Sequence, residues 1–374
     1  VRNNANNLWE SRVMKAKAAV MRAAHEPLTI EEIEIDEPAR REVLVRTVYA
    51  GVCHSDLHFI EGLYPIPCPC VLGHESAGVI EAVGEDVTYV KPGDHVITCL
   101  STFCGECEFC LTGRMSLCQS PMVQRAPDAQ QRLTQNGEVM GQFANLSSYA
   151  EYILTHEHSV VKVREDMPLD RAALIGCGVM TGVGAVFHTA QVRPGDTVAV
   201  FGCGGIGLSA VNGAAIAGAG QVIAVDMVGS KLNLAKEFGA TDVIDASRDD
   251  PVKVIRDITG GGVQYSFEAV GLKVTAEQCF RSLKRGGTAT IIGMVPVGTN
   301  VELHGPDFLQ EKKIQGSTMG SNRFRVDMPR LVEMYLRGDL KLDQMISGRL
   351  KLDQINDAMD DLKAGEVARN VIAF

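Results

Sequence analysis

The 374-residue sequence lacks the features that would take a protein to a membrane or a nucleic acid. It has no uninterrupted apolar run of about 18 residues, the length that a membrane-spanning helix needs. Its most apolar stretch, 210–228, is broken by Asn212, Gln221 and Asp226. It also has no basic run, and its formal net charge of -10 at pH 7 repels phosphate backbones. We therefore expect a water-soluble protein that binds neither membranes nor nucleic acids.

The N-terminus lacks the apolar segment of a secretory signal. Residues 1–13 are polar and Asn-rich, and we interpret them as a tag or disordered extension ahead of Met14. The eleven cysteines are an odd number, and four of them fall within fifteen residues. Without a secretory signal this pattern favours thiolate metal ligands over disulfides, so we expect a reducing, cytoplasmic location.

Two patterns of secondary structure divide the chain, whose length exceeds what one hydrophobic core usually serves. Up to about Val179, short β-like runs are broken by Gly and Pro, which predicts a β-rich domain. From about Thr197, strand, helix and strand alternate, which predicts a doubly wound parallel sheet of the α/β class. After residue 320, two amphipathic helices, 329–337 and 354–363, precede a terminal strand that could belong to either domain.

Four closely spaced cysteines predict a structural zinc site. The pattern C-x-x-C-x-x-C-x7-C has two-residue spacers that let successive thiolates turn toward one tetrahedral ion. Its members are Cys104, Cys107, Cys110 and Cys118. Four thiolates leave no open coordination position, so this site would hold a loop rather than catalyse. The alternatives are free thiols on a loop and an iron–sulfur cluster, although the rest of the chain offers a hydride cofactor site rather than an electron-transfer context.

A second group of residues predicts a catalytic zinc. Cys53, His74 and Cys177 offer two thiolates and one neutral imidazole, which would leave zinc neutral with an open fourth position for a substrate oxygen. Each residue alone is a weak signal, because a lone Cys is usually a small buried hydrophobe and a lone His a hydrogen-bonded residue. Cys70 lies close enough to His74 in the sequence to be an alternative zinc ligand. The cysteines interpreted as packing thiols are Cys68, Cys70, Cys99, Cys203 and Cys279.

A glycine-rich turn predicts a dinucleotide site. The strand 197–201 leads into G-x-G-x-x-G and an Ala-rich helix, the context in which this motif binds a pyrophosphate at the helix N-terminus. Asp226 ends the next strand, where a carboxylate can bind the adenosine ribose and repel a 2'-phosphate, so NAD is favoured over NADP. The alternative is an acidic residue that only ends a strand. Lys231 could also reach the ribose. The turn residues assigned to the cofactor are Gly202, Gly204, Gly205, Ile206 and Gly207.

These motifs, in this order, resemble those of the zinc-containing alcohol dehydrogenases of the medium-chain dehydrogenase/reductase superfamily, from about Met14 to Phe374. The resemblance implies a GroES-like β-rich catalytic domain of residues 14–179 and 321–374, and a Rossmann NAD-binding domain of residues 180–320. It implies NAD as cofactor and two zinc ions per chain, one catalytic and one structural, on the ligands given above. The segment 118–152 resembles the longer loop of dimeric members, which suggests a homodimer.

The resemblance also assigns roles around the catalytic zinc. Asp56 matches the carboxylate that orients the zinc-bound His, and Glu75 matches the acidic residue behind the metal. Ser55 would accept the proton of the substrate hydroxyl and pass it through the cofactor ribose toward His58, whereas a turn serine and an exposed histidine are the alternatives. Further cofactor contacts are implied for His54, Thr181, Val270, Ile292 and Arg369.

The function implied by the resemblance is hydride transfer between a primary alcohol/aldehyde pair and NAD. A pocket lined by Leu100, Val123 and Thr318 would be mostly apolar and would suit an unbranched or aromatic primary alcohol. Either direction is open, since zinc polarises an aldehyde carbonyl as readily as it acidifies an alcohol.

Three other functions are alternatives. A glutathione-type formaldehyde dehydrogenase of the same family is expected to carry Arg where this chain has Met122 and Tyr where it has His58, although Arg125 lies nearby. A polyol or sugar dehydrogenase would more often lack Cys at the position of Cys177. A non-catalytic zinc- and NAD-binding module would leave the second zinc site without a use.

Overall fold

The computed structural model describes residues 13–365 and 367–374, and the chain divides into two compact units. The first unit comprises the residues up to 176 together with 348–363 and 370–374. The second unit comprises residues 177–347 and 364–369. Residues 1–12 of the predicted extension lie outside the described residues, but Val13, which we assigned to it, begins strand β1.

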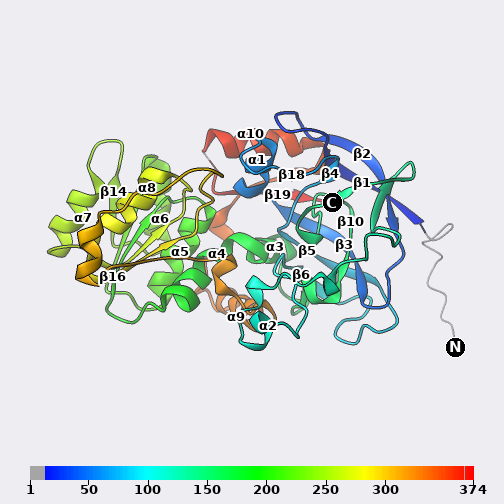
Figure 1. Cartoon of the computed structure of the whole chain (residues 1–374), viewed down its shortest axis with the longest axis horizontal. Coiled ribbons are helices and arrows are strands. Elements are labelled where there is room, and N and C mark those ends of the chain that lie inside the picture. Colours follow the sequence, from blue (N-terminus) through cyan, green and yellow to red (C-terminus); the bar gives the residue numbers. More distant parts are fainter. Residues whose placement is uncertain (1–12, 366) are drawn as a thin grey trace. The chain divides into compact units, whose positions relative to one another are not determined.

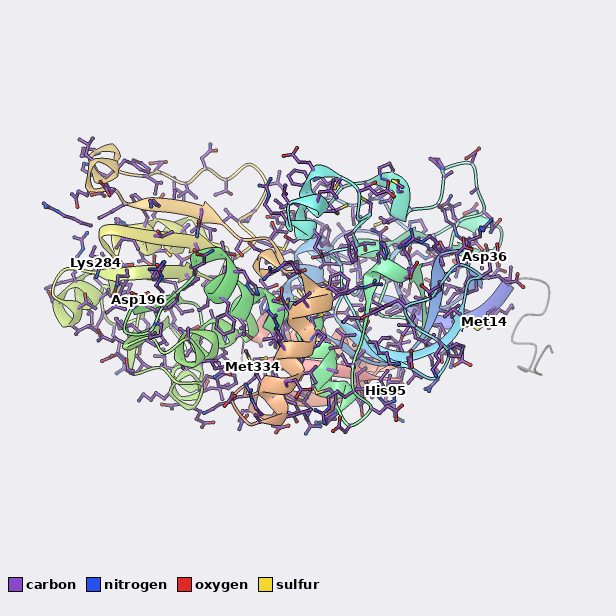
Figure 2. All side chains as sticks on the ribbon, turned by 90° about the horizontal axis from the view of Figure 1, so that it is seen from below. Met14, Asp36, His95, Asp196, Lys284 and Met334 are labelled. Atoms are coloured by element: carbon purple, nitrogen blue, oxygen red, sulfur yellow. The ribbon has the colours of Figure 1, made fainter. Side chains whose placement is uncertain are left out.

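The first unit contains two β-sheets (Figure 1). One sheet has the order β8-β7-β2-β1-β4-β9, and the other has the order β11-β6-β5-β3-β19-β18, with β10 also paired to β3. Met14 and Asp36 lie at adjoining ends of the antiparallel pair β1 and β2 (Figure 2). The strands are β1 Val13–Met21, β2 Thr29–Asp36, β3 Glu42–Gly51, β4 Cys70–Val71, β5 Ser76–Val83, β6 His95–Thr98, β7 Leu133–Gln135, β8 Glu138–Val139, β9 Gly141–Gln142, β10 Tyr152–His156, β11 Val160–Lys162, β18 Ile346–Lys351 and β19 Arg369–Ala373.

The alternation of buried and exposed side chains along the strands builds the core of the first unit. In β1 the side chains of Met14, Ala16 and Ala18 are buried, whereas those of Lys15 and Lys17 between them are exposed, as expected for a strand with one face on a core. The buried face packs with apolar side chains of β2, β3 and β10 in one cluster. This is the β-rich domain that the sequence predicts.

The second unit contains a parallel sheet of order β14-β13-β12-β15-β16-β17, in which the strand order reverses between β12 and β15. Ligands of such sheets bind beyond the carboxyl ends of the strands at this reversal. The predicted doubly wound sheet is therefore confirmed. Its strands are β12 Thr197–Phe201, β13 Gln221–Asp226, β14 Asp242–Asp245, β15 Val263–Glu268, β16 Leu283–Ile291 and β17 Lys313–Gly316. The helices between these strands are α5 Gly205–Ile216, α6 Gly229–Glu237, α7 Pro251–Thr259 and α8 Lys273–Arg281.

Residues 321–347 pack with the second unit, which differs from the expected return of the whole C-terminal segment to the catalytic domain. Helix α9, Phe324–Leu336, buries Phe324 and Met328 and contacts α4, Met180–Gly184. Farther on, Asn212 of α5 accepts a hydrogen bond from the backbone of Lys341 at 3.0 Å. The amphipathic pattern predicted the helix but not the surface on which its apolar face packs. The later residues, 370–374, do join the first unit, because β19 pairs with β3.

A second difference is the helical run 169–190, which includes α3, Leu169–Leu174, and α4. Its length and mean hydropathy of 1.5 pass the test for a membrane-spanning helix, but 83% of the tested window is buried inside the protein, as in a core helix. Two π-helical stretches, Ile175–Val179 and Ala185–Ala190, interrupt it. Such distortions are frequent at functional sites, and the first of them contains Cys177. The remaining helices are α1 His54–Ile60, α2 Glu108–Leu111 and α10 Ile355–Ala364.

Candidate active site

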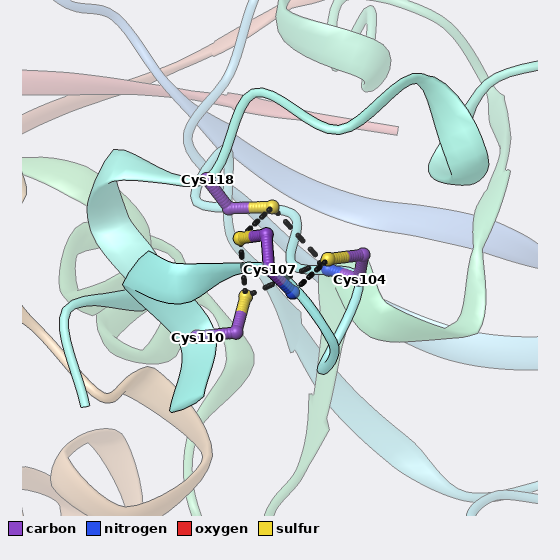
Figure 3. A group of neighbouring side chains, drawn as sticks. All are labelled: Cys104, Cys107, Cys110 and Cys118. Atoms are coloured by element: carbon purple, nitrogen blue, oxygen red, sulfur yellow. Dashed lines mark hydrogen bonds between the residues drawn. The ribbon is translucent and has the colours of Figure 1, made fainter. Parts of the chain in front are cut away.

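The predicted structural cysteines come together on one loop (Figure 3). Cys107 Sγ lies 3.5 Å from Cys110 Sγ and 3.8 Å from Cys118 Sγ, and Cys104 Sγ lies 3.8 Å from Cys110 Sγ. A tetrahedron with Zn–S distances of about 2.3 Å has edges of about 3.8 Å, so these four sulfurs fit a single zinc ion. A multi-iron cluster would hold the sulfurs farther apart.

Backbone groups favour thiolate in this cluster. The N–H groups of Glu106 and Cys107 donate to Cys104 Sγ at 3.4 and 3.3 Å, and they hold the pKa of Cys104 at about 6. By contrast, burial raises the pKa of Cys110 to about 12. Because a metal displaces thiol protons, zinc binding at this cluster should release protons and weaken as the pH falls.

The first unit brings three candidate catalytic-zinc residues together. Cys53 precedes α1, and His74 and Glu75 precede β5; all three are buried, and their ligand atoms lie within 4.8 Å of one another. Cys177, the third predicted ligand, directly follows Gly176 at the unit boundary and is buried. Two thiols and an imidazole remain the predicted donor set.

Asp56 orients His74 through a buried hydrogen-bond network. Its Oδ1 accepts from His74 Nδ1 at 3.2 Å and from Gly73 N at 3.0 Å, and its Oδ2 accepts from the Tyr149 hydroxyl at 2.8 Å. The other ring nitrogen of His74, Nε2, is buried and pairs with no oxygen or nitrogen in the described part of the chain, as expected of a nitrogen kept for a metal. Burial raises the pKa of Tyr149, and the neighbouring Asp56 raises it further, so this residue is a hydrogen-bond donor at neutral pH.

Replacing Asp56 with Asn is expected to lower zinc affinity or kcat/KM by about 10- to 100-fold, because an amide cannot accept from all three donors and would misorient His74. Zinc content and alcohol-dependent NADH formation measure the effect. Tyr149→Phe is the matched control, since it removes one of the three bonds and should cost less. Full activity and full zinc content in Asp56→Asn would show that the network does not orient the imidazole.

The predicted proton-relay residues lie on one short helix. Ser55 Oγ is 3.6 Å from Cys53 Sγ, and His58 follows three residues later, on the same side of α1. His58 stacks against Tyr64, with ring centroids 6.3 Å apart and an interplanar angle of 12°. Burial lowers the pKa of His58, which keeps it neutral and able to take up a proton. His54, the first residue of α1, is exposed, as a pyrophosphate contact would need.

An aromatic wall beside His74 was not predicted. Phe143 lies edge-on to the His74 ring at 5.6 Å, and Phe59 lies edge-on to Phe143 at 4.7 Å. These residues are distant in sequence, so no local pattern marks them. Of the predicted pocket residues, Val123 is buried and Leu100 is half-buried. The third, Thr318, is an exposed residue of the second unit.

In the second unit the glycine-rich turn has the shape that the fingerprint requires. Gly202 has φ +92°, and a Cβ on Gly207 would lie 1.7 Å from the Gly202 carbonyl oxygen, so neither position accepts a side chain. Gly204 caps α5, which starts with Gly205 and Ile206. Free backbone N–H groups of this helix end are available to an anion.

Two residues predicted to bind the cofactor, Asp226 and Arg369, lie against this turn. Asp226 Oδ2 accepts from Cys203 N at 2.7 Å, which ties the end of β13 to the glycine-rich turn. The buried Arg369 lies against the start of α5, because a Cβ on Gly205 would be 2.7 Å from its Nε. A guanidinium beside a helix N-terminus fits a pyrophosphate. The other members are Lys231 on α6, Thr181 on α4, Val270 after β15 and Ile292 after β16.

Comparisons with known proteins agree with both units. The chain matches the family model of the alcohol dehydrogenase GroES-like domain over residues 39–165 and that of the zinc-binding dehydrogenase over residues 205–336. It is 39% identical to S-(hydroxymethyl)glutathione dehydrogenase of Escherichia coli O139:H28, over 96% of this chain and 100% of that protein. It is 38% identical to alcohol dehydrogenase class-3 of Pisum sativum, over 97% of this chain and 99% of that protein. Among solved structures, benzyl alcohol dehydrogenase from Acinetobacter calcoaceticus has a TM-score of 0.91 and 34% identity, over 96% of this chain and 99% of that one.

Proposed function

Since the chain belongs to the zinc-containing alcohol dehydrogenase family, we propose that it interconverts free primary alcohols and their aldehydes with NAD as hydride carrier. Cys53, His74 and Cys177 would hold the catalytic zinc, which when bound supplies a Lewis acid for the substrate oxygen. The buried donor set, with His74 Nε2 kept from other polar partners, is the observation that carries the proposal. The four clustered cysteines would hold the structural zinc.

Side chains of this protein would then orient the zinc ligand His74 and carry the proton away from the alcohol. Asp56 fixes the orientation of His74. Ser55, next to Cys53, accepts the hydroxyl proton of the alcohol, and His58 on the same side of α1 receives it on its way to solvent. Phe59 and Phe143 keep water from the side of His74 that they cover, and they offer ring faces and edges to an apolar or aromatic substrate.

A free alcohol fits this site better than the thiol adduct that the name of the Escherichia coli relative specifies. A carboxylate-bearing adduct needs a cation, and the candidate is Arg125, which lies three residues after Met122 in the sequence. Its side chain is only 9% exposed and its guanidinium donates to Glu42 and Asp36, so its charge is already paired within the protein. Met122, at the position expected to carry Arg in that branch, is 60% exposed and uncharged.

The test is the initial rate of NADH formation with primary alcohols of increasing length, with benzyl alcohol, and with formaldehyde in the presence and absence of glutathione. We expect turnover of the free alcohols and no stimulation by glutathione. Activity confined to the glutathione adduct would replace this proposal with the formaldehyde branch. No NADH formation by folded, zinc-replete protein would favour the non-catalytic binding module.

Replacing Arg125 with Ala is expected to lower the free energy of unfolding by about 3 kcal/mol, because it leaves the buried Glu42 and the half-buried Asp36 short of a partner. Burial alone would raise the pKa of Glu42, but Arg125 and Arg132 outweigh it and lower that pKa. Urea unfolding measures the loss, with the exposed Arg248→Ala as control. A stable Arg125→Ala variant that has lost only activity with the glutathione adduct would instead make Arg125 a substrate residue.

We also propose that the protein is a homodimer of a reducing cytoplasm. None of the eleven cysteines, all of which lie within the described ranges, forms a disulfide, in keeping with a reducing location. Sedimentation or light scattering at physiological concentration tests the dimer.

A further inference from the structure

A buried carboxylate that the proposed mechanism does not use lies at the cofactor edge of the second unit. Glu268 is the last residue of β15 and is completely buried. Its Oε1 accepts three hydrogen bonds, from Val270 N at 2.9 Å, Gly271 N at 2.8 Å and Thr275 Oγ1 at 2.7 Å. Its Oε2 is also buried but has no hydrogen-bond partner among the residues that the structure describes.

Glu268 lies between the segments that carry two predicted cofactor contacts. Its Oε1 holds the backbone of Val270, and its backbone carbonyl accepts from Ile292 N at 2.9 Å. On its other side, Glu268 is in register with Phe201, the residue before the glycine-rich turn. It therefore lies at the reversal of strand order where a dinucleotide binds.

No cation neutralises this side chain within the described ranges, where it forms no ion pair. Oε2 faces glycine backbone instead: a Cβ on Gly293 would lie 2.5 Å from it and 2.2 Å from Gly271 N. A buried carboxylate with an unpartnered oxygen is costly unless a positive charge comes close. The oxidised nicotinamide ring of the proposed cofactor would carry such a charge, and the reduced ring would not.

We propose that Glu268 positions the cofactor and sets the preference between its two redox forms, its negative charge favouring NAD+ over NADH. This inference rests on the proposed NAD-dependent function. Opposite charges interact strongly where water is excluded. If Glu268 only held the loop at Val270 in place, that loop would bind both forms equally well. The residue acts through charge and loop position, and it transfers neither proton nor hydride.

Glu268→Gln isolates the charge, because the amide oxygen can still accept from the same three donors. Dissociation constants for NAD+ and for NADH are measured by calorimetry on the zinc-loaded full chain. We expect NAD+ affinity to fall roughly tenfold and NADH affinity to change less than about twofold. Glu277→Gln is the matched control, since it removes the same charge from α8, where Glu277 pairs with Lys273, and should change neither constant.

Thr275→Val gives the complementary variant, because it removes one donor and keeps the charge; it should weaken both forms alike. If Glu268→Gln does not fold, Glu268→Asp, which draws the charge back by one methylene, should lower NAD+ affinity and spare NADH. If the variant that tests the charge loses affinity for NAD+ and NADH equally, or for neither, the inference is overturned and the proposed function stays intact. Failure of the unmodified chain to bind either form would overturn both.

Discussion

Replacing Cys53 with Ser is expected to lower alcohol-dependent NADH formation by roughly a thousandfold or more, which corresponds to about 4 kcal/mol of lost transition-state stabilisation. A serine hydroxyl stays protonated at neutral pH and is a poor zinc ligand, so the buried set around His74 would lose its metal. Metal analysis should find one zinc per chain in place of two, because the cysteine cluster on its own loop is unaffected. Rate and zinc content are measured on the same preparation.

Cys70→Ser is the matched control for this substitution. Burial raises the pKa of Cys70 to about 12, so this thiol is protonated, and we interpret it as a packing residue in β4. It should retain two zinc ions and nearly full activity. Loss of the catalytic zinc in Cys70→Ser together with its retention in Cys53→Ser would exchange the roles of the two cysteines.

The second large effect is expected from Cys107→Ser in the four-cysteine cluster. The helix next to it, α2, has no buried residue, so this part of the loop packs little against the rest of its unit. With three thiolates left, the structural zinc should be lost and the free energy of unfolding should fall by about 3 kcal/mol or more, which lowers Tm by roughly 5–10 °C. Calorimetry and metal analysis check this result.

Cys68→Ser serves as the control for the cluster, because Cys68 is exposed and outside it. It should change neither Tm nor zinc content. A Cys107→Ser chain that keeps two zinc ions, or keeps its Tm after losing one, would show that the cluster does not stabilise the fold through a metal.

The sequence predicts those parts of the molecule whose chemistry is local. Spacing alone indicates the Cys104 cluster and the turn from Gly202 to Gly207, because in both cases neighbouring residues form the whole structure. Asp226 follows from its place after the next strand. The parallel sheet follows from the regular alternation of strands and helices.

Contacts between distant segments could not be predicted in the same way. Tyr149 donates to Asp56 from 93 positions away, and Phe143 reaches His74 from a separate loop. In the sequence Glu268 looks like any acidic residue at a strand end, since only the fold reveals that one of its oxygens has no partner among the described residues. The packing of 321–347 on the second unit likewise depends on which surface α4 and α5 expose.

Zinc content and NADH formation, measured on one sample before and after treatment with a chelator, test the central claim most directly. We predict two zinc ions per chain at the start, loss of alcohol-dependent NADH formation when the catalytic ion is removed, and recovery when zinc is added back. Undiminished NADH formation by a folded chain from which all zinc has been removed would contradict it.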